Sequence, residues 1–229
     1  MNFAGLPERL AHIRAEIARR QAAGGWQQAV TIVAVTKGFG PDAVRAARAA
    51  GLPDVGENRV QEALDKMAQV PDPDVAWHLI GHLQRNKAKL VPGRFALVHS
   101  VDSGELAEEL ARRAAAHGSR QRLLVQVNVA GEEQKSGCAP AAAPALVRRI
   151  AALDALALEG LMTMAQLTDD AEAQRRTFRE LRRLRDALQE EGIWLPTLSM
   201  GMSGDYTTAV AEGATVIRLG TALFGARTA

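Results

Sequence analysis

The sequence is short of cysteine and of long apolar runs. Cys138 is the one cysteine among 229 residues, which excludes an intramolecular disulfide and suits a reducing compartment. No apolar stretch approaches the roughly 20 residues that cross a bilayer, and the first residues contain no hydrophobic signal core. These absences exclude disulfide-built secreted scaffolds and predict a soluble, cytoplasmic protein.

A clear excess of one charge is also missing. Lys and Arg total 28 against 26 Asp and Glu, so the pI of about 9.0 is weak evidence for a nucleic-acid partner. The densest basic segment is a predicted helix at 169–191, in which Glu172 and Glu180 lie at helical pairing distance from Arg176 and Arg183. A solvated face of paired charges is therefore favoured over nucleic-acid binding.

What the sequence contains is a repeated alternation of strand-like and helix-like segments. Eight runs are predicted as buried strands, at 30–36, 54–56, 75–80, 96–101, 123–129, 156–162, 197–200 and 215–219. Helical patterns separate them, and no long linker, low-complexity segment or internal repeat interrupts the order. We therefore predict one α/β domain over 1–229, a single (β/α)8 barrel of the TIM type.

An additional helix is predicted before the first strand, over 6–20. Acidic residues within it argue against an organelle transit peptide. Its apolar residues recur at helical spacing and form one stripe, made of Leu6, Leu10, Ile13 and Ile17. We therefore expect an extra N-terminal helix that packs against the barrel.

One predicted strand is followed directly by an amine. The run TIVAVTKG at 31–38 places Lys37 at the end of a buried strand. In (β/α)8 barrels the functional groups sit at the carboxyl ends of the strands. Lys37 is therefore either a solvated surface charge or a nucleophile at the barrel mouth.

Two glycine-rich loops follow the seventh and eighth strands. They read SMGMSGD at 199–205 and GTALFG at 220–225. Glycines let the backbone approach an anion, and Ser203 and Thr221 supply hydroxyl donors. Each loop alone is compatible with simple helix capping, but both occupy positions at which this fold binds phosphate. We therefore predict a phosphate site between them.

A phosphate site beside Lys37 suits a ligand that carries both a phosphate and a carbonyl group. Pyridoxal 5′-phosphate, bound to lysine as a Schiff base, is one such ligand, and a phosphosugar is another. Arg218, two residues before the second loop, either contacts the ring nitrogen or forms a salt bridge in the barrel wall. A permanent cation at the ring nitrogen would disfavour its protonation and weaken the ring as an electron sink.

Sequence blocks along nearly the whole chain resemble the pyridoxal phosphate homeostasis proteins, which share the fold of the alanine racemase N-terminal domain. The blocks are VTK at 35–37, GENRVQE at 56–62, WHLIGHLQRNK at 77–87, HSVD at 99–102, QVN at 126–128 with KSG at 135–137, GLMTM at 160–164, SMGMSGDY at 199–206 and RLGTALFG at 218–225. The resemblance implies that pyridoxal 5′-phosphate is the cofactor.

The resemblance also implies a set of cofactor-binding residues, in which Lys37 forms the internal aldimine. The others are the phosphate ligands Ser203, Gly220 and Thr221, the ring neighbours Met202 and Arg218, and the wall residues Asn58, His78 and Ser199. His78 is equally compatible with a satisfied core histidine. No residue is predicted to bind metal or to act as a catalyst.

Two positions are left open by the resemblance. Lys135 matches the family and either holds cofactor in transit or is a solvated loop lysine. After Lys37 the chain reads Gly38-Phe39-Gly40 before Pro41, where the family often has a short polar step to proline. The shape of this loop is therefore not predicted.

The resemblance bears on whether the protein is an enzyme. Alanine racemase has a second, β-rich domain whose tyrosine works opposite the lysine, whereas this chain ends at Ala229 and has one tyrosine, Tyr206. We therefore expect a monomer or weak homodimer that binds pyridoxal 5′-phosphate and passes it to apo-enzymes, without robust catalysis. The alternatives are a small amino-acid racemase with Lys37 as its sole base and, more distantly, a Schiff-base aldolase acting on a phosphosugar.

Overall fold

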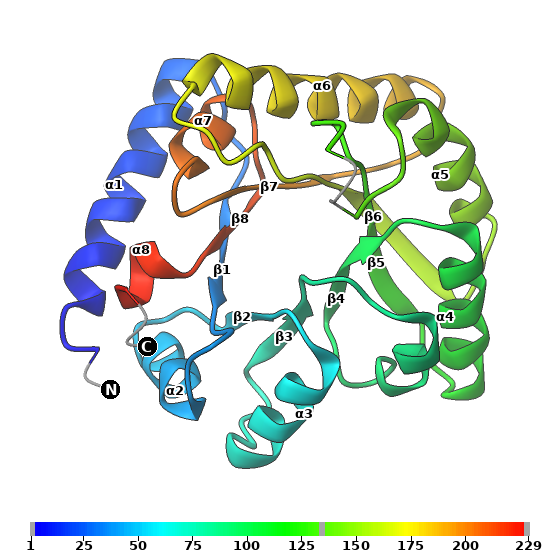
Figure 1. Ribbon diagram of the computed structural model, residues 1–229, viewed down its shortest axis with the longest axis horizontal. Helices are drawn as coiled ribbons and strands as arrows, with labels where there is room; N and C mark the ends of the chain where they lie inside the picture. The colour runs from blue at the N-terminus through cyan, green and yellow to red at the C-terminus, as the bar shows by residue number, and fades with distance from the viewer. Residues whose placement is uncertain (1–2, 133–135, 227–229) are drawn as a thin grey trace.

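The computed structural model describes residues 3–132 and 136–226. Its strands form a closed barrel in which each strand pairs in parallel with the next one in sequence and β8 pairs with β1 (Figure 1). The strands are β1 (Thr31–Val35), β2 (Asp54–Glu57), β3 (Ala76–Leu79), β4 (Leu97–Val101), β5 (Gln121–Gln126), β6 (Leu156–Met162), β7 (Thr197–Met202) and β8 (Val216–Leu219). The predicted (β/α)8 barrel is confirmed.

Helices surround the ring of strands (Figure 1). They are α1 (Leu6–Gly24), α2 (Pro41–Ala49), α3 (Val60–Gln69), α4 (Gly104–Ala116), α5 (Ala143–Ala151), α6 (Ala171–Glu190), α7 (Tyr206–Ala211) and α8 (Thr221–Phe224), with short 3-10 helices η1 (Arg85–Leu90) and η2 (Pro140–Ala142). Across 3–132 and 136–226, no helix combines the length and apolar character needed to cross a membrane.

The helix α1 is the extra N-terminal helix that the sequence predicts. It packs against α7 and α8, and Arg9 Nε donates a hydrogen bond to the carbonyl oxygen of Leu223 at 2.6 Å. Its buried stripe is the predicted one, Leu6, Leu10, Ile13 and Ile17. The helix therefore braces the side of the barrel from which the two glycine-rich loops emerge.

The core has two apolar layers, because successive strand residues point to opposite faces of the sheet. Val98 and Leu161 belong to the large cluster between the sheet and the helices. Their chain neighbours Leu97 and Met162 pack instead with Leu124 in a separate cluster inside the barrel. Burial of both layers supplies the main stabilising free energy of the fold, and buried polar side chains such as His99 and Ser199 are also present.

The fifth strand differs from its prediction. The apolar pattern predicts 123–129, but β5 begins at Gln121 and ends at Gln126. The start was missed because Gln121 is polar, although its buried amide donates to the carbonyl oxygen of Phe95 at 3.1 Å. The end comes earlier because Val127 leaves the regular ladder for an isolated bridge with Cys138.

The arginines of α6 form ion pairs within the protein. Arg175, Arg179 and Arg182 all reach the buried carboxylate of Glu212, at nitrogen–oxygen distances of 3.6, 2.9 and 3.3 Å. Glu172 pairs with Arg175 and not with Arg176 as the sequence suggested. A charge-paired helix face accounts for this basic segment, with Glu212 as a partner that helical spacing could not reveal.

Candidate functional site

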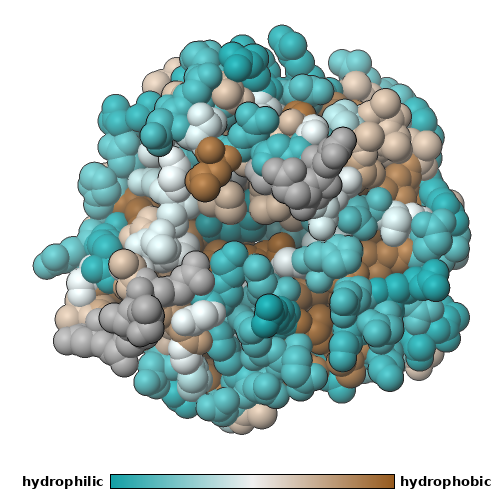
Figure 2. Space-filling view, viewed as in Figure 1, coloured by the Kyte–Doolittle hydropathy of each residue, from teal (hydrophilic) through white to brown (hydrophobic). Residues whose placement is uncertain are grey.

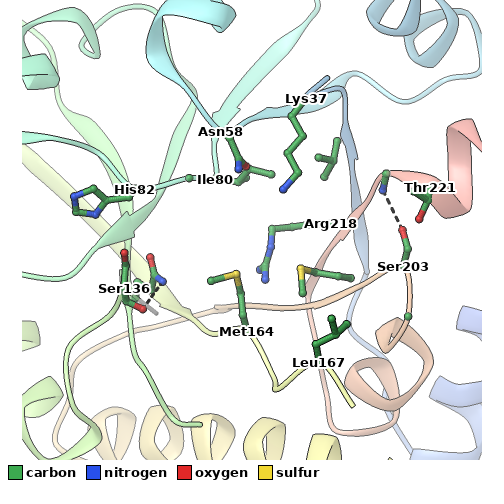
Figure 3. Close-up of a pocket in the computed structure, with 16 residues that line it drawn as sticks. Lys37, Asn58, Ile80, His82, Ser136, Met164, Leu167, Ser203, Arg218 and Thr221 are labelled. Atoms are coloured by element: carbon green, nitrogen blue, oxygen red, sulfur yellow. Dashed lines mark hydrogen bonds between the residues drawn. The ribbon is translucent and has the colours of Figure 1, made fainter. Parts of the chain in front are cut away.

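A pocket of about 510 Å³ opens at the carboxyl ends of the strands. Figure 2 shows a hollow near the middle of one face, with hydrophobic surface inside it and a mostly hydrophilic surround. The side chains in the pocket come from several strands and the loops that follow them (Figure 3). Seven residues of the predicted set line it, namely Lys37, Asn58, Met202, Ser203, Arg218, Gly220 and Thr221.

Lys37 follows β1 and extends its amine into the pocket, toward Arg218 (Figure 3). The next residue, Gly38, has a φ of 74°, a left-handed conformation that glycine adopts without strain. The N–H of Phe39 then donates to the carbonyl oxygen of Thr36 at 3.0 Å. The backbone therefore turns sharply at the lysine, which leaves its side chain at the barrel mouth.

A buried ion pair holds the residue that precedes Lys37. Lys66 of α3 places its Nζ 2.6 Å from Oε1 of Glu57 and 2.8 Å from the carbonyl oxygen of Thr36. The hydroxyl of Thr36 donates to the same Glu57 oxygen at 2.5 Å, and both residues are fully buried. These contacts clamp the ends of β1 and β2 together, which fixes the backbone next to Lys37.

The unusual step Gly38-Phe39-Gly40 builds an aromatic cluster. The buried ring of Phe39 lies 5.3 Å from the ring of Phe224 in α8 and 6.1 Å from that of Phe3, measured between centroids. Phe3 and Phe224 are themselves 5.4 Å apart. The loop after Lys37 is thus packed against α8, which lies within the second glycine-rich segment at 220–225, and this contact fixes the separation between the two segments.

Ser203 joins the two glycine-rich loops. Its Oγ accepts hydrogen bonds from the backbone N–H groups of Gly220 at 3.2 Å and Ala222 at 3.1 Å, which leaves its own proton to donate. The side chain of Thr221 stands beside it (Figure 3). Within the described part of the chain no carboxylate lines the pocket, so this corner presents donors to an anion.

Arg218 forms a cationic floor to the pocket. Its buried guanidinium donates from Nη1 to Ser199 Oγ at 2.6 Å and from Nη2 to the carbonyl oxygen of Thr163 at 2.9 Å. Burial lowers the pKa of Arg218 to about 10, so the group is still a cation at neutral pH. Both of these bonds go to neutral groups, the nearby carboxylate of Asp205 supplies a charge that favours the cation, and Arg218 itself lines the pocket.

Two residues of the predicted set lie outside the pocket wall. His78 is buried, with Nε2 2.9 Å from Asp54 Oδ1 and Nδ1 2.9 Å from His99 Nε2. Ser199 is fully buried and lies 2.8 Å from His99 Nδ1. Both precede the ends of their strands, so their side chains lie deeper in the barrel than the mouth. His78 is therefore a satisfied core histidine, the alternative that the sequence left open.

Several pocket residues were not singled out by the sequence. Gln126 donates from Nε2 to the carbonyl oxygen of Ser136 at 2.7 Å, and Met164 and the exposed Leu167 supply an apolar edge. His82 completes this side of the wall. All but Leu167 belong to family-like blocks, and that membership was the only available signal.

Two further predictions concern Lys135 and metal binding. Lys135 lies outside the described residues. In the ranges 3–132 and 136–226, no group of three or more His, Cys, Asp or Glu side chains is arranged to hold a metal ion.

The fold and the pocket define a barrel of the alanine racemase N-terminal domain class. A family model described as alanine racemase, N-terminal domain matches residues 9–228. The solved alanine racemase of Clostridium difficile, in complex with cycloserine, superimposes with a TM-score of 0.77 at 14% identity. The match covers 97% of this chain and 60% of that enzyme, and at this identity it compares the fold alone.

Relatives of higher identity narrow this class. The pyridoxal phosphate homeostasis protein of Pseudomonas aeruginosa is 44% identical over 223 residues, which cover 97% of this chain and 96% of the relative. PipY of Synechococcus elongatus, solved without PLP and with PLP bound, is 40% identical, with TM-scores of 0.87 and 0.85 over 96% of this chain and 100% of PipY. This chain belongs to the pyridoxal phosphate homeostasis protein family.

Proposed function

We propose that this protein binds pyridoxal 5′-phosphate as a Schiff base on Lys37 and acts in intracellular vitamin B6 homeostasis. The observation that carries the proposal is that one pocket combines a lysine amine, the Ser203-bridged loops and the buried Arg218 cation. Relatives in Pseudomonas aeruginosa and Aquifex aeolicus are named for this homeostasis, and PipY has been solved with PLP bound.

The donor set fits the chemical groups of this cofactor. The Lys37 amine can attack the aldehyde carbon, and loss of water then leaves a C=N bond that hydrolysis reverses. Hydroxyls of Ser203 and Thr221 can donate to a phosphate, and Gly220, which has no side chain, lets the group approach the backbone closely. Asn58 and Met202 line the remaining wall beside the ring. The aldehyde, the phosphate and the ring of the cofactor therefore each have candidate partners among the residues that line this pocket.

Arg218 favours holding the cofactor over using it. When bound, pyridoxal phosphate supplies a ring that withdraws electrons most strongly with its nitrogen protonated, and a guanidinium facing that nitrogen disfavours the proton. Tyr206, the only tyrosine of the chain, is buried and does not line the pocket. It therefore supplies no second base opposite Lys37.

In this proposal the protein buffers the cofactor in the cytoplasm and passes it to PLP-dependent apo-enzymes, as a monomer or weak homodimer. The transfer of cofactor is supported by the position of the site at the barrel mouth, where Thr221 and Leu167 are exposed. A cofactor bound there is within reach of water or of an amine from a second protein, either of which can release it by attack on the C=N bond.

The absorption spectrum with added pyridoxal 5′-phosphate tests the Schiff base. We expect a yellow band that borohydride bleaches, that Lys37→Ala abolishes and that Lys89→Ala, at an exposed lysine outside the pocket, retains. A protein that stays colourless would overturn the proposal. Racemisation of alanine at ordinary enzymatic rates, about 1 per second or faster, would contradict the carrier role while leaving cofactor binding intact.

A further inference from the structure

A chain of buried polar side chains crosses the barrel below the pocket. It runs from Asp54 at the start of β2, through His78 and His99, to Ser199 and Arg218. Successive polar atoms are 2.9, 2.9, 2.8 and 2.6 Å apart. The side chain of Asp54 is 27% exposed and that of His78 is 7% exposed, while His99 and Ser199 are fully buried. The chain therefore links a carboxylate at one end of the barrel to the cation at the other.

The hydrogen bonds of this chain have a single direction when both histidines are neutral. Arg218 can only donate, so Ser199 Oγ accepts from it and its own proton is left to bond His99 Nδ1. His99 then carries its proton on Nε2 and donates to His78 Nδ1. His78 in turn donates from Nε2 to Asp54, so both ring nitrogens of each histidine have a hydrogen-bond partner.

The opposite direction leaves a conflict with neutral rings. If His99 donated from Nδ1 to Ser199, its Nε2 would accept the Nδ1 proton of His78. The bare Nε2 of His78 would then face the carboxylate oxygen of Asp54 at 2.9 Å, two acceptors with no proton between them. Such an unsatisfied, partly buried pair is costly, so the carboxylate end decides the direction of all the hydrogen bonds in the series.

The surroundings of His99 favour its neutral form. Burial, the largest cause, lowers the pKa of His99 well below its ordinary value of 6.5, and the positive charge of Arg218 acts in the same direction. The ring therefore carries one proton at neutral pH, and with His78 also neutral the hydrogen bonds place that proton on Nε2. Ser199 is then fixed as an acceptor toward Arg218.

We propose that Asp54, His78, His99 and Ser199 form a positioning relay that fixes the hydrogen bonding and orientation of Arg218 at the floor of the pocket. The relay works through its neighbours, since none of the four residues lines the pocket. With Nη1 bound to Ser199 and Nη2 to Thr163, the plane of the guanidinium is set. Its effect on the cofactor ring rests on the proposed function, whereas the relay itself does not.

The proton positions of the relay are measurable without any cofactor. The protein has five histidines. Replacing the three that lie outside the relay, as H12Q/H82Q/H117Q, leaves only His78 and His99. In ¹⁵N-labelled protein of this variant at neutral pH, long-range ¹H–¹⁵N spectra should show both rings protonated at Nε2 alone. An Nδ1-protonated or doubly protonated His99 would overturn the relay.

A double-mutant cycle then tests whether the relay reaches the pocket. Asp54→Asn replaces the terminal carboxylate by an amide of similar shape, and we expect it to shift the visible band of bound pyridoxal 5′-phosphate and to weaken binding by about fivefold, within the range for residues of one network. In a Ser199→Ala background the same change should have no further effect. An Asp54→Asn effect of equal size with and without Ser199 would refute transmission through the relay.

Controls separate failure of the relay from failure of the proposed function. Asp74→Asn alters a mostly exposed carboxylate that pairs with Arg48, and it should change neither the spectra nor the affinity. If the unchanged protein bound no pyridoxal 5′-phosphate, the proposed function would fail, and the imidazole spectra would still decide the proton positions of the relay.

Discussion

At the scale of single residues, the pocket depends on side chains that hold other parts of the site in place. Ser203 is the clearest case, because it bonds the backbone of the opposite loop at two N–H groups and still has a proton to donate. Arg218 likewise uses two N–H donors to anchor itself and keeps its charge at the pocket. A substitution at such a residue should therefore weaken binding only of ligands that carry the chemical group with which the residue interacts.

Replacing Ser203 by alanine should weaken binding of pyridoxal 5′-phosphate about tenfold or more, because a hydrogen bond to a charged group contributes about 1.5–3 kcal/mol. Pyridoxal has the same aldehyde without the phosphate, so it is a matched ligand and should bind both proteins equally. Titration followed by absorbance measures both affinities. An equal loss for pyridoxal would show that Ser203 does not act on the phosphate.

Cys138 should be a slow thiol. Burial, aided by the negative charge of Asp102, raises the pKa of its thiol to about 11, so less thiolate is present at any lower pH. At pH 8 we expect alkylation by iodoacetamide to be roughly two orders of magnitude slower than for free cysteine, and to accelerate as the pH rises toward 11. Mass spectrometry measures the rate, and a rate equal to that of free cysteine would contradict the expectation.

At the scale of elements, close contacts between neighbouring strands, loops and helices hold the site together. The pair of Lys66 and Glu57 ties α3 to the end of β2 and, through Thr36, to β1. The last residues of β7 pass so close to α7 that a Cβ on Gly201 would lie 2.6 Å from Cβ of Ala209. Both contacts are specific enough to test by substitution.

Replacing Lys66 by methionine should destabilise the fold by about 3–5 kcal/mol, because it leaves the buried Glu57 carboxylate without its cation. Urea denaturation measures the loss. Adding Glu57→Gln should recover part of the stability, since the unpaired charge is then removed. Lys89→Met, at an exposed lysine, is the control and should be nearly neutral; a similar loss there would argue against a role for the ion pair.

Gly201 and Gly192 offer a matched pair of substitutions. Both have positive φ, 95° and 88°, but a Cβ on Gly192 meets nothing within 4 Å. Gly192→Ala should therefore cost only the left-handed conformation, about 1–2 kcal/mol, and Gly201→Ala about 1–3 kcal/mol more because of overpacking against α7. If thermal or urea unfolding showed the same loss of stability for both variants, the added Cβ at Gly201 would not be overpacked against α7.

Much of this arrangement can be predicted from the sequence, for a physical reason. Parallel strands buried on both faces are continuous apolar runs, so segments such as 31–35 and 216–219 are recognisable, and strand ends of a barrel converge at one mouth. Buried polar residues cannot be predicted in this way, because they interrupt the apolar runs. The start of β5 at Gln121 was missed, and no local spacing indicates that His78 and His99 meet inside the barrel, because that contact depends on how the strands are arranged in the barrel.

At the scale of the whole molecule, a ligand that binds only the folded barrel must stabilise it. At a pyridoxal 5′-phosphate concentration about 100 times its dissociation constant, the gain is about 2.7 kcal/mol. For a protein of this size that corresponds to a melting temperature higher by about 5–10 °C. Differential scanning calorimetry should show this shift in the unchanged protein and a much smaller one in Lys37→Ala. An equal shift in both would mean that the amine contributes little to retention.

The pairing of β1 with β8 joins the first strand of the chain to the last, from Thr31 with Val216 to Ala34 with Leu219. Lys37 follows one side of this seam and Gly220 the other. Closing the seam joins the segments most distant in sequence, a step that loop-closure entropy makes slow. The pocket therefore exists only in molecules whose ring is closed. Ligand binding at this pocket therefore reports whether β1 and β8 are paired. Binding should be lost when that pairing opens, even if the remaining strands stay paired.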